Sequence, residues 1–250
     1  SGLLLTVMIS RARSISNEKS QEVQEAKDGL ISLASHQLRT PATSVKQFVG
    51  MILEGYVGPI TSEQKQMLQK AYNSNERQLE IINQILHVTR ADSGRLVLNK
   101  ERLDIVKLIK QAASEHKQSL QMRNQKLIIH KSKPIFIVAD KHYLAMAIDN
   151  LLSNASKYSK PKSTIRVKVA TSNGQVQISV IDHGIGIAEK DLNRLFQKFS
   201  RIDNELSVEA GGNGIGLYLC KQIITLHDGE INIDSEVDKG TTFTISLPWK

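Results

Sequence analysis

Apolar residues recur at alternating intervals of three and four between residues 31 and 52, and this spacing constrains the fold more than any other feature. The seven positions are Ile31, Ala34, Leu38, Pro41, Val45, Phe48 and Ile52. In a helix this repeat places every member on one narrow stripe, which is typical of helices that pack side by side. The segment is therefore predicted to be a helix that packs on other helices through this stripe.

His36 lies inside this segment but outside its apolar stripe. On the same repeat it falls at a position that faces solvent. Thr40 follows one turn later on the same outer face, because residues four apart are neighbours on a helix. Pro41 removes a backbone donor and is expected to kink the helix just after the histidine. An exposed imidazole beside a kink would be accessible to a large reactant; an ordinary surface histidine is the alternative.

A second long helix is predicted after a sharp stop. The stretch 55–59 holds two glycines and a proline, and Thr61 then offers an N-cap followed by an early acid, Glu63. This helix, which should end near residue 93, has its own stripe at Leu68, Tyr72, Asn75, Leu79, Ile82, Leu86 and Thr89. One antiparallel hairpin cannot bury both apolar faces alone, so pairing into a homodimeric four-helix bundle is expected.

The character of the chain changes after a short connector. Leu96–Leu98 is a candidate short strand there, and Asn173-Gly174 signals a hairpin turn further on. Helices are predicted at about 105–122, 142–157 and 216–227. Runs that favour strands are 127–129, 135–138, 164–170, 176–181, 230–233 and 241–247. Strands interleaved with helices predict a two-layer α/β domain.

Composition narrows the classes of partner. The net charge is +8, but acids and bases are mixed and no basic run with interleaved aromatics exists, so no nucleic-acid partner is expected. The single cysteine, Cys220, excludes an intrachain disulfide and a cysteine zinc site, and it is expected to be buried. Leu3–Ile9 is apolar but too short to span a bilayer, and Arg11 and Arg13 follow it. This pattern favours the cytoplasmic end of a membrane-spanning helix, with the last strand of a sensory domain as the alternative.

Four polar or glycine-rich clusters in the second half have the chemistry of a nucleotide site. The first comprises Asn150, Asn154, Lys157 and Tyr158, which share one helix face. Amide oxygens suit a hard cation such as Mg²⁺, a lysine suits phosphate, and a tyrosine can lie against a purine. A solvated polar helix face is the alternative.

The next two clusters are rich in glycine. Asp182 follows a strand and could accept a hydrogen bond from an exocyclic amine, while Gly184 and Gly186 let the backbone approach a base. The run 211–217 precedes a helix, where exposed amides attract phosphate. It is neither a Walker A loop nor a Rossmann turn, because the flanking residues do not fit either motif.

The fourth cluster surrounds two phenylalanines, Phe196 and Phe199, for which packing in the core is an equal alternative. The polar stretch 202–210 follows and is predicted to be a lid over the nucleotide. Arg201 could reach a terminal phosphate when such a lid closes.

These clusters, in this order after Ser35-His36-Gln37-Leu38-Arg39-Thr40-Pro41, resemble the N, G1, G2 and F boxes and the H-box of sensor histidine kinases with a HisKA hairpin and a GHKL-type ATPase domain. Gly240-Thr241-Thr242-Phe243 resembles the final Gly-Thr-x-Phe element of that family. The resemblance implies an α and α/β multidomain chain: a helical hairpin forming a dimeric four-helix bundle, then a two-layer α/β sandwich of the Bergerat type. The implied parts are a membrane stub or sensor remnant with a signalling helix (1–27), the phosphotransfer hairpin (28–94), a linker (95–104) and the ATP-binding domain (105–250).

The activity that the resemblance implies is phosphorylation of His36 from Mg²⁺-ATP and transfer of the phosphoryl group to an aspartate of a response regulator. Regulator phosphatase activity, for which Thr40 would orient water, is a further expectation. The implied setting is the cytoplasmic portion of a bacterial inner-membrane protein. Catalytic roles fall to His36, Gln37, Arg39 and Thr40, and Asn154 would hold Mg²⁺. The implied nucleotide contacts are Asn150, Asn154, Lys157, Tyr158, Asp182, Gly184, Gly186, Ile187, Phe199, Arg201, Gly212, Gly214, Ile215, Gly216, Leu217 and Thr242.

Gln37 departs from the family pattern. The residue after the histidine is usually an acid, and an amide cannot act as a general base. A regulator phosphatase that binds ATP but transfers it poorly is therefore one alternative, and a non-catalytic dimeric scaffold is another. A third is a different GHKL ATPase, such as a chaperone or topoisomerase, but those proteins lack the hairpin with His36.

Overall fold

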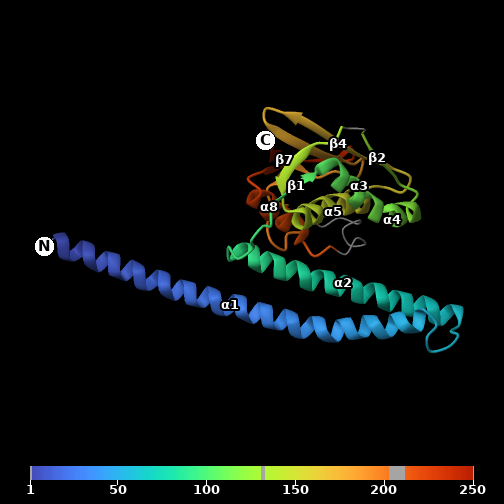
Figure 1. Cartoon of the computed structure of the whole chain (residues 1–250), viewed down its shortest axis with the longest axis horizontal. Helices are drawn as coiled ribbons and strands as arrows, with labels where there is room; N and C mark the ends of the chain where they lie inside the picture. Colours follow the sequence, from blue (N-terminus) through green and yellow to red (C-terminus); the bar gives the residue numbers. More distant parts are fainter. Residues whose placement is uncertain (1, 131–132, 203–211, 250) are drawn as a thin grey trace. The chain divides into compact units, whose positions relative to one another are not determined.

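The computed structural model describes residues 2–130, 133–202 and 212–249, and the chain divides into two compact units, Ser1–Leu96 and Val97–Lys250 (Figure 1). None of the described helices combines enough length with enough apolar character to cross a membrane. The predicted lid lies outside the described residues except for Ile202.

The first unit is a hairpin of two long helices, α1 (Gly2–Leu53) and α2 (Ser62–Asp92) (Figure 1). Residues 3–9 are part of α1, so the alternative of a sensory-domain strand there is wrong. The helix also continues through Pro41. The N-cap of α2 is confirmed, and it forms a capping box: the Gln64 amide donates to Thr61 Oγ1 (3.2 Å) and the Thr61 amide donates to Gln64 Oε1 (2.9 Å).

The apolar stripe of α2 is confirmed, because each of its seven members is buried or half-buried. The stripe predicted on α1 does not meet α2: Leu38 is 52% exposed and Phe48 is 65% exposed. Helix α1 turns another face to α2. On that face Arg39 donates to Asn83 Oδ1 (2.7 Å), Lys46 pairs with Glu76 (2.7 Å), and the small residues Ser35 and Ala42 are buried. The repeat named no particular neighbour for the apolar face, and the small residues Ser35 and Ala42 let α2 approach on a different face.

The second unit has a five-stranded sheet and a two-stranded ribbon. The sheet order is β2-β4-β5-β7-β6, with β2 parallel to β4 and the other pairs antiparallel, and β1 pairs with β3. The strands are β1 (Glu101–Asp104), β2 (Lys126–Ile129), β3 (Phe136–Ala139), β4 (Thr164–Ser172), β5 (Gln175–Ile181), β6 (Glu230–Glu236) and β7 (Gly240–Pro248). The helices are α3 (Ile105–Glu115), α4 (Lys117–Met122), α5 (Lys141–Lys157), α6 (Glu189–Leu192) and α8 (Gly216–Leu226).

The two-layer α/β architecture is confirmed. Alternate residues of β4, β5 and β7, such as Ile165, Ile178 and Ile245, are buried on one face of the sheet, where α3, α5 and α8 cover it (Figure 1). Asn173 and Gly174 both have positive φ (51° and 72°) and join β4 to β5 as predicted.

Three details differ from the sequence-based expectation. The predicted helix 105–122 is divided at His116 into α3 and α4. Residues 96–98 do not form a strand; the strand is β1, further along the expected linker, because Leu103 can be buried where β1 pairs with β3. The short helix α6 was not predicted. Cys220 is buried as expected, and burial raises the pKa of its thiol to about 12.

Candidate nucleotide-binding and phosphoacceptor sites

Helix α5 presents the first polar cluster near its C-terminal end. The Asn154 side-chain amide donates to Asn150 Oδ1 (3.1 Å), so these two residues, one turn apart, form a pair. This bond uses one hydrogen of the Asn154 amide and leaves its side-chain oxygen available to a ligand. Tyr158 follows as the C-cap residue. The helix face predicted from the sequence therefore exists, and its amide oxygens suit a hard cation.

The segment after α5 is held by two residues that the sequence did not single out. Gln125 is buried and donates through Nε2 to the carbonyls of Ser156 (3.0 Å), Ser159 (3.3 Å) and Lys160 (3.2 Å), while the Ser156 hydroxyl donates to Gln125 Oε1 (2.6 Å). Arg123 adds donors to two carbonyls in the same segment (3.2 and 3.3 Å). A helix ends with unsatisfied carbonyls, and these side chains satisfy them. They thereby fix the backbone that carries Lys157 and Tyr158.

Asp182 is 6% exposed and accepts two backbone hydrogen bonds at Oδ1, from Gly184 (2.9 Å) and Thr241 (3.2 Å). Burial raises the pKa of this carboxyl above its ordinary value, and the two amide donors oppose that rise. Since both bonds reach Oδ1, the other carboxylate oxygen is the one available to an exocyclic amine.

Tyr158 connects three of the predicted clusters. Its carbonyl accepts a hydrogen bond from the Ile185 amide (3.3 Å), and any side chain on Gly184 would overlap that carbonyl. Its hydroxyl lies 3.7 Å from the position of a Cβ on Gly212. Burial raises the pKa of Tyr158, and the charge of Arg201 opposes that rise. The structure thus brings the N-box and both glycine clusters together.

Helix α8 starts within the second glycine cluster. Ile215 holds the N-cap position without a side-chain cap, and its own amide donates to Asn213 Oδ1 (3.1 Å). The first turn, which includes Gly216 and Leu217, therefore offers backbone amides and the positive end of the helix dipole. Asn150 lies directly against this turn, because a Cβ on Gly216 would overlap its side-chain amide. The arrangement suits phosphate beside the Asn150–Asn154 pair.

Replacing Gly216 by alanine is expected to weaken ATP binding by about tenfold, because Asn150 must move away and its bond to Asn154 is lost. The matched variant is Gly29→Ala on the hairpin, where no described atom lies within 4 Å of the new methyl group. Titration calorimetry on both variants measures the effect. Equal affinities for the two variants would contradict this role of Gly216.

Thr242, Phe196 and Phe199 have none of the contacts described above. Thr242 is half-buried and its side chain lies on the opposite face of β7 from that of Thr241, whose backbone amide donates to Asp182 Oδ1, so its contact with the nucleotide stays a prediction. The alternative that Phe199 packs in the core is wrong, because its side chain is 66% exposed; its backbone has a positive φ of 59°. Phe196 is half-buried, with the Lys221 ammonium 5.5 Å from its ring centre.

The predicted phosphoacceptor lies on the hairpin. His36 is exposed, as the repeat predicted, and the neighbouring Gln37 is exposed as well. The Thr40 hydroxyl donates to the His36 carbonyl (3.2 Å), and Arg39 is tied to α2 through Asn83. Arg39 therefore has a structural contact that the sequence did not predict.

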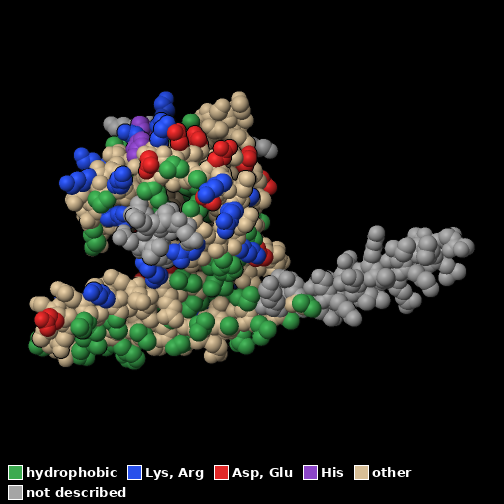
Figure 2. Space-filling model, turned by 180° about the vertical axis from the view of Figure 1, so that it is seen from behind, with side chains coloured by type: hydrophobic (Ala, Val, Ile, Leu, Met, Phe, Trp, Pro, Cys, Tyr) green, Lys and Arg blue, Asp and Glu red, His purple; other side chains and the backbone are tan. Residues whose placement is uncertain are grey.

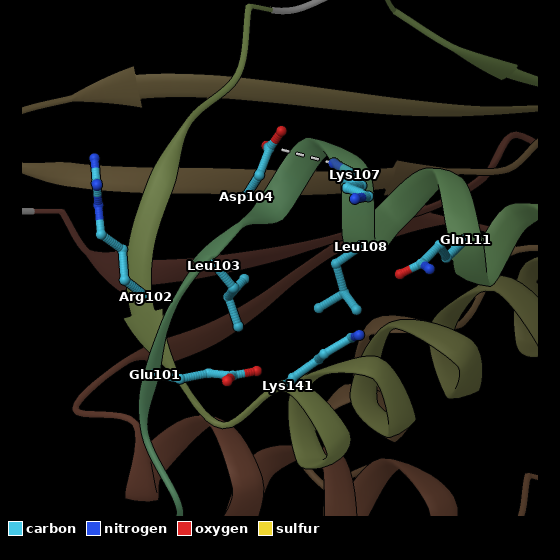
Figure 3. Close-up of a pocket in the computed structure, with 8 residues that line it drawn as sticks. All are labelled: Glu101, Arg102, Leu103, Asp104, Lys107, Leu108, Gln111 and Lys141. Carbon is cyan, nitrogen blue, oxygen red and sulfur yellow. Dashed lines mark hydrogen bonds between the residues drawn. The ribbon is translucent and has the colours of Figure 1, made fainter.

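A separate hollow of about 230 Å³ lies among β1, α3 and the start of α5. Figure 3 shows the side chains of Glu101 and Lys141 at one end of it, with Leu103 and Leu108 between β1 and α3. It includes no residue of the nucleotide cluster, so it is not the predicted ATP site.

Two family models match the chain. One, the His Kinase A phospho-acceptor domain, matches residues 26–94, and the other, the ATPase family of histidine kinases, DNA gyrase B and HSP90, matches residues 139–250. The circadian input-output histidine kinase CikA of Synechococcus elongatus is 32% identical over 91% of this chain and 31% of its own length. The sensor protein SrrB of Staphylococcus aureus (strain MRSA252) is 30% identical over 99% of this chain and 41% of its own length. The chain thus spans less than half of these relatives.

Solved structures show the same fold. Full-length ShkA in complex with AMPPNP superposes with a TM-score of 0.72 at 23% identity, over 88% of this chain and 46% of that one. The Acinetobacter baumannii histidine kinase AdeS gives a TM-score of 0.60 at 21% identity, over 86% of this chain and 98% of that one. A phosphoacceptor module around His36 and an ATPase module around the nucleotide cluster occur here in one chain, which therefore belongs to the sensor histidine kinases of two-component systems.

Proposed function

We propose that the chain transfers the terminal phosphoryl group of ATP to His36 and then to an aspartate of a response-regulator receiver domain. The observation that carries this proposal is the assembly of Asn150, Asn154, Tyr158 and Asp182 beside the N-terminus of α8, in a chain that also exposes His36 on a hairpin. The hairpin (28–94) would be the phosphotransfer domain and 105–250 the catalytic domain. The complex of ShkA with AMPPNP shows that a protein of this fold binds an ATP analogue.

The residues suggest how ATP is held. Asp182 would accept the exocyclic amine of adenine through its second carboxylate oxygen, and the first turn of α8 would bind phosphate. Mg²⁺ fits the site because Asn154 offers an amide oxygen, and it would supply charge neutralisation on the phosphates. Lys157 and Arg201 would add positive charge there, and Ile187 would close the base site.

The chemical step exchanges one bond to phosphorus for another. A ring nitrogen of neutral His36 attacks the terminal phosphorus, a nitrogen–phosphorus bond forms, and the bond to the leaving ADP oxygen breaks. The proton on the other ring nitrogen must then be released. Gln37 can orient the ring by hydrogen bonding but cannot accept that proton.

The exposed stripe of α1 supports a homodimer. Its large members Leu38, Val45 and Phe48 are each at least 47% exposed, and Leu30 and Leu33, outside the stripe on α1, are exposed as well. Figure 2 shows hydrophobic side chains gathered along the hairpin. An apolar surface of this kind on a helix pair is buried when a second helix pair packs against it, which gives a four-helix bundle.

We also propose that the chain acts at the cytoplasmic face of a bacterial inner membrane, with α1 leading from a sensory part to the hairpin. Leu3–Ile9 followed by Arg11 and Arg13 supports this setting. A regulator phosphatase activity through Thr40 is a second candidate, favoured by Gln37 in place of an acid.

The test is incubation of the chain with ATP labelled on its terminal phosphate. Label that is acid-labile, base-stable and located on His36 supports the kinase. If His36 carries no label, while the chain releases phosphate from a phosphorylated receiver domain, the phosphatase alternative holds instead.

Replacing Gln37 by glutamate is expected to raise the rate of autophosphorylation by about tenfold or more, because a carboxylate can take the imidazole proton. The matched control is Gln47→Glu, which adds the same charge at another exposed position of α1. Initial rates of labelling measure both. A Gln37→Glu rate at or below that of the wild type would show that proton removal at this position does not limit the step.

A further inference from the structure

The hydroxyl of Ser235, on β6, joins three segments around the proposed adenine site. It accepts a hydrogen bond from the Ile187 amide (2.9 Å), donates to the Gly240 carbonyl (3.1 Å) and lies 2.8 Å from Thr241 Oγ1. A serine hydroxyl has one hydrogen and two lone pairs, so all three bonds form together when the Thr241 hydroxyl is the donor. The hydrogen and both lone pairs of the Ser235 hydroxyl then have partners.

Two partners of Ser235, Thr241 and Ile187, belong to segments that adjoin Asp182. The Thr241 amide donates to Asp182 Oδ1 (3.2 Å), and the Asp182 amide donates to the Thr241 carbonyl (2.9 Å). Ile187 lies one residue before the end of the loop that Asp182 begins. The Ser235 hydroxyl therefore connects the far end of that loop to the strand that holds the carboxylate.

The sheet does not need this hydroxyl for its register. Ser235 and Thr241 are partners in the backbone pairing of β6 with β7. The loop, by contrast, has four bonds to other segments among the described residues: Asp238 donates to the Ile185 carbonyl (2.8 Å), Ile185 donates to the Tyr158 carbonyl (3.3 Å), Ile187 donates to Ser235 (2.9 Å), and Arg166 Nη1 lies 2.7 Å from His183 Nε2. Loss of the hydroxyl would leave the half-buried Ile187 amide without the acceptor that it has among the described residues.

We propose that Ser235 is a positioning residue for recognition of the adenine base. It holds the loop 183–187 so that the second carboxylate oxygen of Asp182 faces the exocyclic amine. The inference rests on the proposed role of Asp182 as the residue that reads adenine. It assigns to Ser235 the selection of adenine over guanine, which carries a carbonyl where adenine carries the amine.

The experiment compares Ser235→Ala with Ser179→Ala in the full chain. Ser179 is a matched control because its hydroxyl likewise pairs with a threonine hydroxyl on β7, that of Thr244 (3.1 Å), but on the opposite face of the sheet. Binding of ATP and GTP is measured by titration calorimetry, together with the melting temperature. Ser235→Ala is expected to weaken ATP binding about tenfold and GTP binding less, so that the ATP-to-GTP preference falls. Ser179→Ala is expected to keep both affinities.

A second pair of variants separates positioning from folding. Ser235→Thr keeps the hydroxyl, and Ser235→Val has the shape of threonine without a hydroxyl. Only the threonine variant should therefore retain the nucleotide preference. The proposal is overturned if Ser235→Ala and Ser235→Val melt earlier yet keep the wild-type preference. If the wild type itself shows no preference for ATP, and Asp182→Asn changes neither affinity, the proposed role of Asp182 fails, and the inference fails with it. If Asp182→Asn removes the preference but the Ser235 variants do not, the inference alone fails.

Discussion

Replacing His36 by glutamine is expected to reduce labelling of the chain from ATP to background while leaving ATP affinity unchanged. Only a ring nitrogen can form the phosphoramidate, and glutamine keeps size and polarity without such a nucleophile. His36 is exposed on α1, so its removal leaves no cavity and should not destabilise the hairpin. The loss is therefore chemical rather than structural.

The measurement is the amount of base-stable label per chain, with ATP affinity and melting temperature recorded for the same sample. His130→Gln is the matched control, because His130 is also exposed but belongs to the second unit. It should label as the wild type does. Label that persists in His36→Gln and moves to another residue would contradict the assignment of the phosphoacceptor.

Local chemistry made much of the fold predictable. The capping box at Thr61 and the Asn173-Gly174 turn depend on residues three or fewer positions apart, and the structure confirms both. The neighbour of the α1 stripe was not predictable in this way. Spacing identifies an apolar face, but which helix covers that face depends on the shape of other surfaces, here the small residues Ser35 and Ala42.

In the candidate site, too, contacts between residues close in sequence could be predicted and contacts between distant segments could not. The Asn150–Asn154 pair could be inferred because its members are one helical turn apart. Gln125 and Ser235 could not, because their roles arise from contacts with segments 31 and 48 residues away. The contact of Thr241 with Asp182 could not be inferred either, because it is made by a backbone amide 59 residues away along the chain.

Replacing Asp182 by asparagine is expected to weaken ATP binding by about 10- to 100-fold, the effect of losing a hydrogen bond to a charged group. The asparagine oxygen can still accept from Gly184 and Thr241, but its amide nitrogen would then face the donor amine of adenine. Autophosphorylation of His36 at limiting ATP should fall by the same factor.

The same substitution is expected to leave the second unit as stable as the wild type, or more stable, at neutral pH. Burial raises the pKa of Asp182 above its ordinary value of 3.8, so the folded state holds the proton more tightly than the unfolded state. The ionised carboxylate therefore costs folding free energy above the raised pKa, and that cost disappears as the pH falls toward 3.8. Asparagine carries no such cost, so its advantage in urea unfolding should be largest at neutral pH and shrink on acidification.

Asp104→Ala is the comparison variant, because it is expected to lose stability and keep its ATP affinity. It removes the N-cap of α3, where Asp104 accepts from Val106 (3.0 Å) and Lys107 (3.4 Å), and should destabilise the second unit by about 1 kcal/mol without changing ATP affinity. If Asp182→Asn instead lost stability and affinity together, Asp182 would be a structural residue whose carboxylate supports the loop. Loss of affinity with retained stability would mean that the fold bears the cost of a buried charge because ATP binding needs it.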